Sequence, residues 1–388
     1  MKSEVKNIVI LLRIFWTAAA QKIAIEEAKV LKTKGFKVTI IFLRGKVPYE
    51  YKEILNGVDY YIASETGNSL LSPVYDYITR LFRPDRSTES RVDFNMIKRF
   101  PKIAKKFEPD YVICHDQYSG LAGYYNLKKN GIPYCVIMHE RPPDFEVPIL
   151  GTIAKMYEKK TLKNAHKVYS MTESIAKSVE EVHGIETEVL NYAVTAQEFI
   201  PFKEKNDSII AVSMWDRGRY PEIYLKIISA LPLSFTLFMV GNWREKSLLE
   251  EFQRKMTSMG LDERVTLLSG LTETELISIY RKSKFSLRFS FDEVGGGMSV
   301  FESVSCGVPV VVNRKLGSAN FVESNGLGAV IRGGSPEDLD IRGIAEFITQ
   351  VNNETEYRKL QDNCRKALAN LSWEKHVETL VTDMVGKK

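Results

Sequence analysis

The chain has 388 residues, which is too long for one ordinary hydrophobic core and suits two domains. Hydrophobic residues make up 44% of it and charged residues 27%, with a net charge of +5, and no apolar run approaches the roughly 20 residues that span a bilayer. The four cysteines are scattered, without a CxxC pair or a histidine at metal-ligand spacing, so we expect reduced thiols in a cytoplasmic protein and no metal site.

The first residues predict a strand, a helix and a second strand in succession. Lys6–Leu12 is a short apolar run that we interpret as a strand and not as a signal peptide. Thr17–Thr33 has apolar residues at helical spacing, Gly35 ends that helix, and Lys37–Leu43 is the next strand. This β-α-β pattern predicts a doubly wound parallel sheet. The first turn, RIFWTAAAQ, contains no glycine, which disfavours an NAD or FAD enzyme.

A basic segment, residues 77–106, follows. Nine lysines and arginines stand there against three acidic residues. No aromatic–glycine motif, zinc finger or recognition helix accompanies them, so we do not expect nucleic acid as the partner. Anionic lipid headgroups, with Phe82, Phe94 and Phe100 inserting beside them, or a polyanionic acceptor fit the pattern. A solvated helix face explains it as well.

Two consecutive strands of the first half end in a histidine. Asp110–Cys114 runs into His115 and Asp116, and Pro133–Met138 runs into His139. Open α/β sheets bind ligands at the carboxyl ends of their strands, so both histidines are candidates for a ligand contact. Each could instead be a capped structural histidine.

The second half restarts the same alternation after a linker that ends near Pro201. Ser208–Ser213 is a strand, and Arg217 and Arg219 follow it. Thr272 and Glu275 have the spacing of a capping box at the start of a helix. The other elements predicted here are a helix over Pro221–Ala230, a strand over Ser234–Val240, a helix over Arg244–Met259, a strand over Arg264–Leu268 and a terminal helix over Trp373–Val385.

The most informative stretch is 285–313, where a glycine loop joins a strand to a short helix. We predict strands over Phe285–Phe291 and Pro309–Asn313 and a helix over Met298–Ser305. A glycine run at a helix start leaves backbone amides open to an anion, and carboxylates suit sugar hydroxyls. The combination suggests a nucleotide sugar, although a loop that only needs glycines to turn remains the alternative. The residues concerned are Gly295, Gly296, Gly297 and, on either side of them, Glu293 and Glu302.

These motifs resemble the GT-B family of retaining glycosyltransferases that includes glycogen synthases, sucrose synthases and phosphatidylinositol mannosyltransferases. FESVSCGVPVVV is similar to the family's E-A-x-x-C-G-x-P-V-V signature, NYAVTAQEFIPF to its interdomain stretch, and DYVICHD to its D-V-x-H-x-H-D. Three features differ: Glu293 lies one residue early relative to Glu302, Met214 stands where the family has an arginine, and the first loop lacks the family's G-G.

The resemblance implies an α/β protein of GT-B architecture, with two Rossmann-like doubly wound domains facing across a cleft. We expect an acceptor-side domain over 1–200, a nucleotide-sugar-binding domain over 201–372, and a C-terminal helix over 373–388 that packs back on the first domain. The implied reaction moves a hexosyl group from a nucleotide diphosphate sugar to a glycan or lipid-linked acceptor. Retention of the anomeric configuration, independence of metal and absence of any cofactor are part of this expectation, as is a cytoplasmic, peripherally membrane-bound location.

The resemblance also assigns roles to single residues. His115 and Glu293 would act on the transferred sugar as catalytic residues, and His139 and Asp116 would make further contacts to the sugar or the acceptor. Two other functions stay open: a sugar-nucleotide epimerase on the same fold, and a catalytically silent donor-binding subunit. The residues assigned to the donor are Arg217, Arg219, Gly295, Gly296, Gly297, Met298, Ser299 and Glu302.

Overall fold

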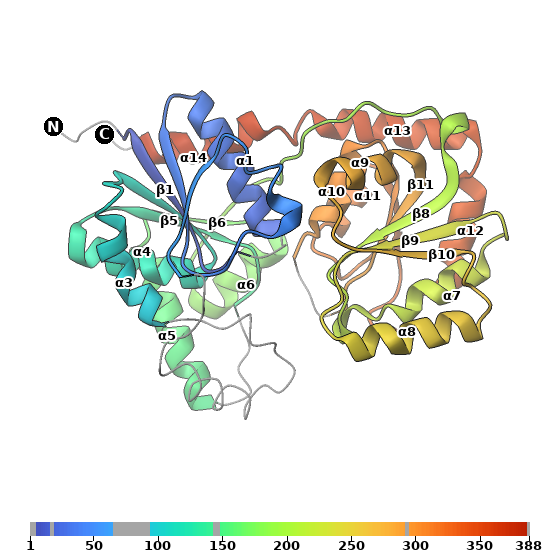
Figure 1. Cartoon of the computed structure of the whole chain (residues 1–388), viewed down its shortest axis with the longest axis horizontal. Coiled ribbons are helices and arrows are strands. Elements are labelled where there is room, and N and C mark those ends of the chain that lie inside the picture. Colours follow the sequence, from blue (N-terminus) through green and yellow to red (C-terminus); the bar gives the residue numbers. More distant parts are fainter. Residues whose placement is uncertain (1–4, 16–18, 65–93, 143–147, 292–294, 386–388) are drawn as a thin grey trace. The chain divides into compact units, whose positions relative to one another are not determined.

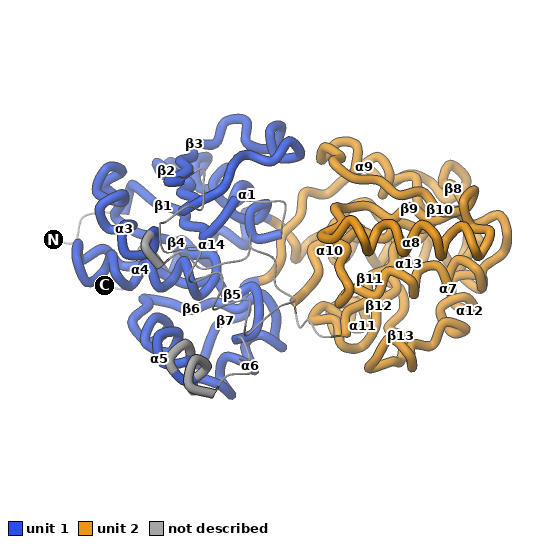
Figure 2. Tube along the Cα trace, turned by 60° about the horizontal axis from the view of Figure 1, so that its bottom comes forward, with its two compact units in different colours: residues 1–190, 373–388 blue, residues 191–372 orange. Residues whose placement is uncertain are grey.

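The chain, described here from a computed structural model, divides into two compact units (Figures 1 and 2). Unit 1 comprises Met1–Leu190 and Trp373–Lys388, and unit 2 comprises Asn191–Ser372. The structure describes residues 5–15, 19–64, 94–142, 148–291 and 295–385. The chain therefore leaves unit 1 once, builds unit 2, and returns to unit 1 for its last helix.

The described part of unit 1 contains a seven-stranded sheet in the order β3-β2-β1-β4-β5-β6-β7, in which all neighbouring strands are parallel. Its strands are β1 (Asn7–Leu12), β2 (Lys37–Phe42), β3 (Asp59–Ile62), β4 (Tyr111–His115), β5 (Tyr134–Met138), β6 (Lys167–Ser170) and β7 (Glu188–Val189). Its helices are α1 (Ala19–Thr33), α3 (Phe94–Ala104), α4 (Gln117–Asn130), α5 (Pro148–Asn164), α6 (Glu173–His183) and α14 (Trp373–Val385), with a 3-10 turn η1 (Tyr49–Tyr51).

Helices cover both faces of this sheet, because its central strands are apolar on both sides. The central strands are continuous apolar runs, such as NIVILL in β1, and are buried along almost their whole length. Figure 1 shows α1 and α14 above the sheet and α3 and α4 below it. The strand order reverses between β1 and β4, and the position outside the carboxyl ends of two such strands is where open α/β sheets bind ligands.

The last helix, α14, packs against α1, the first helix of the chain. Val377 and Leu380 are 0% and 1% exposed and form its apolar face. Polar contacts add to this packing: the Tyr169 hydroxyl donates a hydrogen bond to Asp383 at 2.5 Å, and Lys34 Nζ lies 3.4 Å from Glu378 Oε1. Both an apolar face and side-chain polar contacts thus hold α14 on unit 1.

In unit 2 the described residues form a six-stranded parallel sheet in the order β10-β9-β8-β11-β12-β13. Numbered within the unit, this is the 3-2-1-4-5-6 order of Rossmann folds. Its strands are β8 (Asn206–Val212), β9 (Thr236–Val240), β10 (Val265–Leu268), β11 (Ser283–Arg288), β12 (Val310–Asn313) and β13 (Gly328–Ile331). Its helices are α7 (Glu222–Ala230), α8 (Lys246–Ser258), α9 (Glu273–Lys282), α10 (Met298–Ser305), α11 (Ala319–Ser324), α12 (Ile341–Val351) and α13 (Glu354–Leu368), with the 3-10 turns η3 (Phe202–Glu204) and η4 (Arg217–Arg219).

Two hydrophobic clusters lie on the faces of the unit 2 sheet. The larger one joins α7, α8 and α12 to the sheet around Trp215, Phe285 and Tyr357. The smaller one joins α9 to the end of α10 around Tyr280 and Cys306. The strand order reverses between β8 and β11, so the carboxyl ends of these strands are the expected ligand position in unit 2.

The predicted α/β fold with two Rossmann-like, doubly wound domains is confirmed. The capping box at Thr272 is confirmed as well, with both of its hydrogen bonds to Glu275 formed. The division between the units falls after Leu190 and not after residue 200. The intervening stretch bonds within unit 2, where the Val194 N–H donates to the Leu371 carbonyl and the Gln197 N–H to the Ser305 carbonyl, both at 2.9 Å.

Only 94–106 of the basic segment belongs to the described residues, and there it forms α3 and the turn after it. Lys98, Arg99 and Lys102 are exposed. Phe100 is 0% exposed and packs in the core, so the expectation that it inserts into a membrane is wrong. Phe82 lies outside the described residues. None of the helices described is both long and apolar enough to cross a membrane.

Candidate active site

His115 is the last residue of β4 and lies at the carboxyl edge of the unit 1 sheet. In the sheet register it stands beside Leu12 of β1 and Ile137 of β5. The residue is only 1% exposed. Its ring is therefore enclosed by elements of unit 1 instead of being turned to solvent.

Both ring nitrogens of His115 are engaged in hydrogen bonds. Nε2 lies 2.9 Å from Oε2 of Glu27 on α1, and Nδ1 lies 2.9 Å from Nε2 of His139, which follows β5. The two imidazole rings are nearly parallel, at 19°. The structure thus brings the two histidines together as a bonded pair, with His139 the more exposed member.

The charges around this pair are set by burial and by the neighbours. Burial alone would raise the pKa of Glu27, but the charge and hydrogen bond of His115, with the hydrogen bond of His376, lower it to about 2. Burial and the nearby His115 lower the pKa of His139 to about 3. At neutral pH Glu27 is therefore ionised and His139 is neutral.

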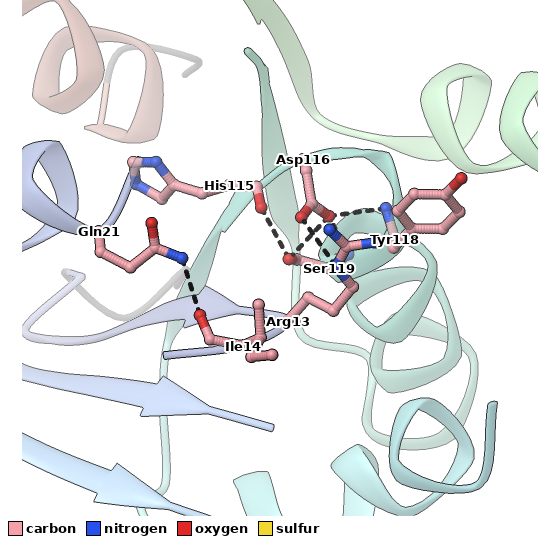
Figure 3. A network of polar contacts seen from close by, with 7 residues as sticks. All are labelled: Arg13, Ile14, Gln21, His115, Asp116, Tyr118 and Ser119. Atoms are coloured by element: carbon pink, nitrogen blue, oxygen red, sulfur yellow. Dashed lines mark hydrogen bonds and ion pairs between the residues drawn. The ribbon is translucent and has the colours of Figure 1, made fainter. Parts of the chain in front are cut away.

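Asp116, the next residue, caps helix α4 from a strained backbone conformation (Figure 3). One carboxylate oxygen accepts hydrogen bonds from the Tyr118 N–H at 2.8 Å and the Ser119 N–H at 2.7 Å. The Ser119 hydroxyl in turn donates to the His115 carbonyl at 2.8 Å. The φ and ψ of Asp116 are 93° and 163°, in a region that essentially only glycine adopts. This strain lies directly beside the histidine pair, as it often does at functional sites.

Residues after β1 complete the polar surroundings in unit 1. Arg13 lies 3.9 Å from Asp116, and its guanidinium group stacks over the Tyr118 ring at 5.0 Å (Figure 3). Gln21 of α1 donates to the Ile14 carbonyl at 2.8 Å, which fixes the loop between β1 and α1. The carboxyl ends of β1 and β4 therefore carry a connected set of cationic, anionic and imidazole groups.

In unit 2, the glycine loop leads from β11 into helix α10. Gly297 has a φ of +67° and occupies the N-cap position without a side-chain cap. A Cβ atom on Gly296 would lie 2.5 Å from the Tyr192 ring. Backbone conformation and close packing therefore explain both glycines. In addition, the backbone N–H groups at the uncapped start of α10 are open to an anion.

The first residues of α10 are buried, and a carboxylate follows them. Met298 and Ser299 are 8% and 7% exposed. The Tyr280 hydroxyl has two acceptors, each at 3.3 Å: the Ser299 carbonyl and the carboxylate of Glu302, which lies one turn further along α10. Tyr280 is buried, which raises its pKa, so it remains a donor at neutral pH. The neighbouring phenol thus orients the Glu302 carboxylate.

The two arginines assigned to the donor differ in their surroundings. Arg217 is largely exposed and forms ion pairs at 3.3 Å with Glu245 and Glu251 on the surface of unit 2. Arg219 lies near the Tyr224 hydroxyl: burial raises the pKa of that phenol, while the charges of Arg288 and Arg219 lower it. Arg219 therefore lies near the buried phenol of Tyr224, whereas Arg217 lies among carboxylates on the surface.

Arg288, at the end of β11, is a residue that the sequence analysis missed. It is 6% exposed and donates from Nη1 to the Ser213 hydroxyl at 3.0 Å. A Cβ on Gly297 would lie 3.3 Å from its Nε. This guanidinium thus stands between the end of β8 and the start of α10. An arginine inside the apolar strand KFSLRF was the signal that could have revealed it.

Glu27 and His376 were missed as well. Glu27 is 0% exposed and stands on the apolar face of α1, among Ile23, Ala28 and Leu31. A carboxylate on an apolar helical stripe needs a buried partner, and this was the available signal. His376 lies on α14, where its sequence neighbourhood carries no ligand pattern.

The candidate residues thus form one cluster in each unit. His115, Asp116 and His139 lie together in unit 1, and the glycine loop, the start of α10 and Glu302 lie together in unit 2. Glu293 falls outside the described residues. Met214, which replaces the family's arginine, has its sulfur 3.0 Å from Nε of Arg244.

Comparisons with known proteins match both units. Residues 20–193 match the model of Glycosyltransferase Family 4, and residues 195–367 match that of Glycosyl transferases group 1. The chain belongs to the GT-B glycosyltransferases. A comparison with curated protein sequences finds no match.

Solved structures share the fold of this GT-B glycosyltransferase at low sequence identity. HepE of Anabaena, in complex with UDP and glucose, has a TM-score of 0.75 and 14% identity and covers 98% of this chain and 100% of its own. Sucrose-phosphate synthase of Thermosynechococcus elongatus has a TM-score of 0.73 and 14% identity, with 97% and 98% covered. A glycosyltransferase of Rickettsia africae has a TM-score of 0.73 and 15% identity, with all of both chains covered.

The strain at Asp116 can be measured with a pair of substitutions. Asp116→Ala loses the helix cap and keeps the strained backbone, whereas Asp116→Gly loses the cap but relaxes the strain. We expect the glycine variant to be the more stable, by about 1–3 kcal/mol beyond the ordinary preference for glycine over alanine at an N-cap. Urea unfolding of both variants measures the difference.

Thr172, the N-cap of α6, supplies the control. Its φ of −147° is unstrained, and its side chain accepts a hydrogen bond from the Ile175 N–H. The alanine and glycine variants at Thr172 therefore give the ordinary N-cap preference alone. A glycine-over-alanine gap at Asp116 no larger than that at Thr172 would contradict the strain.

Proposed function

We propose that the protein transfers a hexosyl group from a nucleoside diphosphate sugar to a glycan or lipid-linked acceptor, with retention at the anomeric carbon. The observation that carries the proposal is the arrangement at the edge of the unit 2 sheet. There the uncapped start of α10, the buried Arg288 and the phenol-oriented Glu302 belong to one strand–loop–helix segment. HepE of Anabaena, which shares the fold, was crystallised with UDP-glucose, and this supports a nucleotide sugar as donor.

The donor contacts divide by chemistry. The amides of Gly296, Gly297 and the first turn of α10 suit the diphosphate, because the positive end of the helix dipole favours an anion there. Arg219 and Arg217 supply positive charge to the diphosphate. Glu302 accepts hydrogen bonds from the ribose hydroxyls, since an ionised carboxylate has two acceptor oxygens.

The reaction exchanges one glycosidic bond for another. The bond from the anomeric carbon to the diphosphate oxygen breaks, the bond to the acceptor oxygen forms, and the acceptor's proton passes to the leaving diphosphate. Positioned cations stabilise the charge that develops on the diphosphate. The histidine pair of unit 1 and Glu293 orient the transferred sugar. Metal independence belongs to this proposal; the described residues contain no group of three or more His, Cys, Asp or Glu side chains that could hold a metal ion.

The acceptor side is proposed to work in the cytoplasm at an anionic membrane surface. Lys98, Arg99 and Lys102 on α3 are exposed, and Lys105 and Lys106 follow in the next turn, also exposed. Since Phe100 packs in the core, attraction there is electrostatic. A soluble glycan is the acceptor if this attraction is absent.

Arg219→Ala tests the diphosphate site. Losing a charge-assisted hydrogen bond to a phosphate oxygen costs about 1.5–3 kcal/mol, so the Kd for UDP should rise by tenfold or more. Uridine binding should be nearly unchanged, because it lacks the phosphates. Calorimetry with UDP, and with GDP and ADP in parallel, measures both quantities.

Arg342, an exposed arginine on α12 paired with Glu346, is the matched control, and Arg342→Ala should change neither Kd. Equal losses for UDP and uridine in Arg219→Ala would remove Arg219 from the phosphate site. Absence of binding to all three nucleotides by the unaltered protein would contradict the donor class itself.

Co-sedimentation with vesicles tests the membrane surface. The triple variant Lys102/Lys105/Lys106→Glu reverses three exposed charges, each worth about 1 kcal/mol near an anionic surface. The unaltered protein should sediment with phosphatidylserine vesicles at low salt and not at high salt, where charges are screened. The variant should remain in solution at both. If the unaltered protein stays in solution at low salt, the membrane proposal is wrong.

A further inference from the structure

Four side chains from four elements form one hydrogen-bonded chain inside unit 1. His139, after β5, bonds to His115 at the end of β4, and His115 bonds to Oε2 of Glu27 on α1. The other oxygen of Glu27, Oε1, lies 2.8 Å from Nε2 of His376 on α14. His115 is 1% exposed, Glu27 0% and His376 4%, so water cannot replace these partners.

The carboxylate determines which ring nitrogens carry protons. An ionised carboxylate only accepts hydrogen bonds, and each oxygen of Glu27 faces one Nε2 atom. Nε2 of His115 and Nε2 of His376 therefore both carry a proton. When His115 is neutral, Nδ1 then has no proton and accepts a hydrogen bond; a second proton on Nδ1 would make that atom a donor.

The donor and acceptor roles at His115 also determine those at His139. With His115 neutral, its Nδ1 accepts, and Nε2 of His139 must be the donor. A neutral His139 is then left with an unprotonated Nδ1, which can accept a hydrogen bond from a hydroxyl group. If His115 instead lost its proton from Nε2, the bond to His139 would reverse and Nδ1 of His139 would become a donor.

A buried carboxylate that is held only by hydrogen bonds and imidazoles is weak evidence for stability. Replacing a buried pair by apolar side chains of similar volume is often neutral or stabilising. Glu27 lies on an otherwise apolar face of α1, where an apolar residue would pack without any desolvation cost. The carboxylate is therefore better explained by what it does to the imidazoles than by the folding of α1.

We propose that Glu27 is a positioning residue that acts through His115 to keep Nδ1 of His139 a hydrogen-bond acceptor for a hydroxyl group of the transferred sugar. His376 holds the second oxygen of Glu27, so the last helix of the chain is part of the arrangement. The proposal rests on the proposed function for the sugar contact, but the proton positions do not depend on it. It makes His139, and not His115, the imidazole that touches the substrate.

The test is Glu27→Met in the full-length protein, read by ¹⁵N NMR of the histidine rings. The ring nitrogen shifts distinguish Nε2–H, Nδ1–H and doubly protonated imidazoles. In the unaltered protein at neutral pH we expect Nε2–H on His115, His139 and His376. The methionine keeps the volume and removes both acceptor oxygens, so His115 and His139 should shift together towards the Nδ1–H form. The proposal is overturned if His139 carries its proton on Nδ1 in the unaltered protein, or if Glu27→Met leaves both rings as they were.

Glu27→Gln is the second variant and serves if the methionine variant does not fold. An amide offers one acceptor oxygen, so His115 and His376 cannot both keep Nε2–H. If both do, the carboxylate does not hold them as proposed. If the proton of His115 moves to Nδ1, the proton of His139 must move to Nδ1 as well. A His139 tautomer that stays unchanged would contradict the proposed series of hydrogen bonds.

Kinetics provide a separate readout. In Glu27→Met, kcat with a nucleotide sugar should fall by between tenfold and about 10⁴-fold, the upper figure being the effect of a lost carboxylate behind the histidine of a serine-protease triad. The Kd for the nucleoside diphosphate should not change, because Glu27 lies in unit 1. An unchanged kcat together with switched tautomers would overturn the positioning role and leave the proposed function intact. If the unaltered protein turns over no nucleotide sugar, the proposed function fails while the NMR result still decides the proton positions.

Glu158→Met is the matched control. Glu158 and His183 form another buried carboxylate–imidazole pair in unit 1, at 3.3 Å between α5 and α6. This substitution removes a buried carboxylate without touching the chain of four. It should leave kcat and the tautomers of His115 and His139 unchanged; a loss equal to that of Glu27→Met would mean that any buried carboxylate of unit 1 has this effect.

Discussion

The parallel pairing of every strand in both sheets is the constraint on which the rest depends. Parallel strands end at the same edge, and each sheet reverses its strand order at one place, between β1 and β4 in unit 1 and between β8 and β11 in unit 2. Candidate side chains lie at those strand ends: His115 is the last residue of β4, and Arg288 is the last residue of β11. Each unit of this GT-B glycosyltransferase thus has its candidate residues at the same topological feature.

The candidate clusters of the two units differ in how they hold their polar groups. Unit 2 relies on backbone geometry: a glycine with a φ of +67° opens α10 without a side-chain cap. Unit 1 relies on buried side chains, with Glu27 between two imidazoles and Asp116 in a strained cap. A backbone site suits a phosphate, which every nucleotide sugar carries, whereas fixed side chains can discriminate between sugars.

The sequence predicted the fold and the candidate residues at the carboxyl edges of the sheets well, because apolar strand runs, helical spacing and glycine loops are local signals. It found His115, His139 and the glycine loop for the same reason: each lies at the end of a strand or in the loop after one. It could not find the pairing of Glu27 with His376, since those residues are far apart in the chain and only the packing of α14 on α1 joins them. It also assigned Arg217 and Arg219 alike, although Arg217 pairs with surface carboxylates in a contact that spacing cannot reveal.

An isotope experiment decides whether the protein transfers sugar. The protein is incubated with a nucleotide sugar that carries ¹³C in its sugar, together with a glycan or lipid-linked acceptor. The products are then separated and quantified by mass spectrometry. We expect labelled sugar in the acceptor and nucleoside diphosphate in equal amounts. Nucleoside diphosphate released without any acceptor, or a donor returned with its sugar altered, would contradict transfer and favour the epimerase alternative.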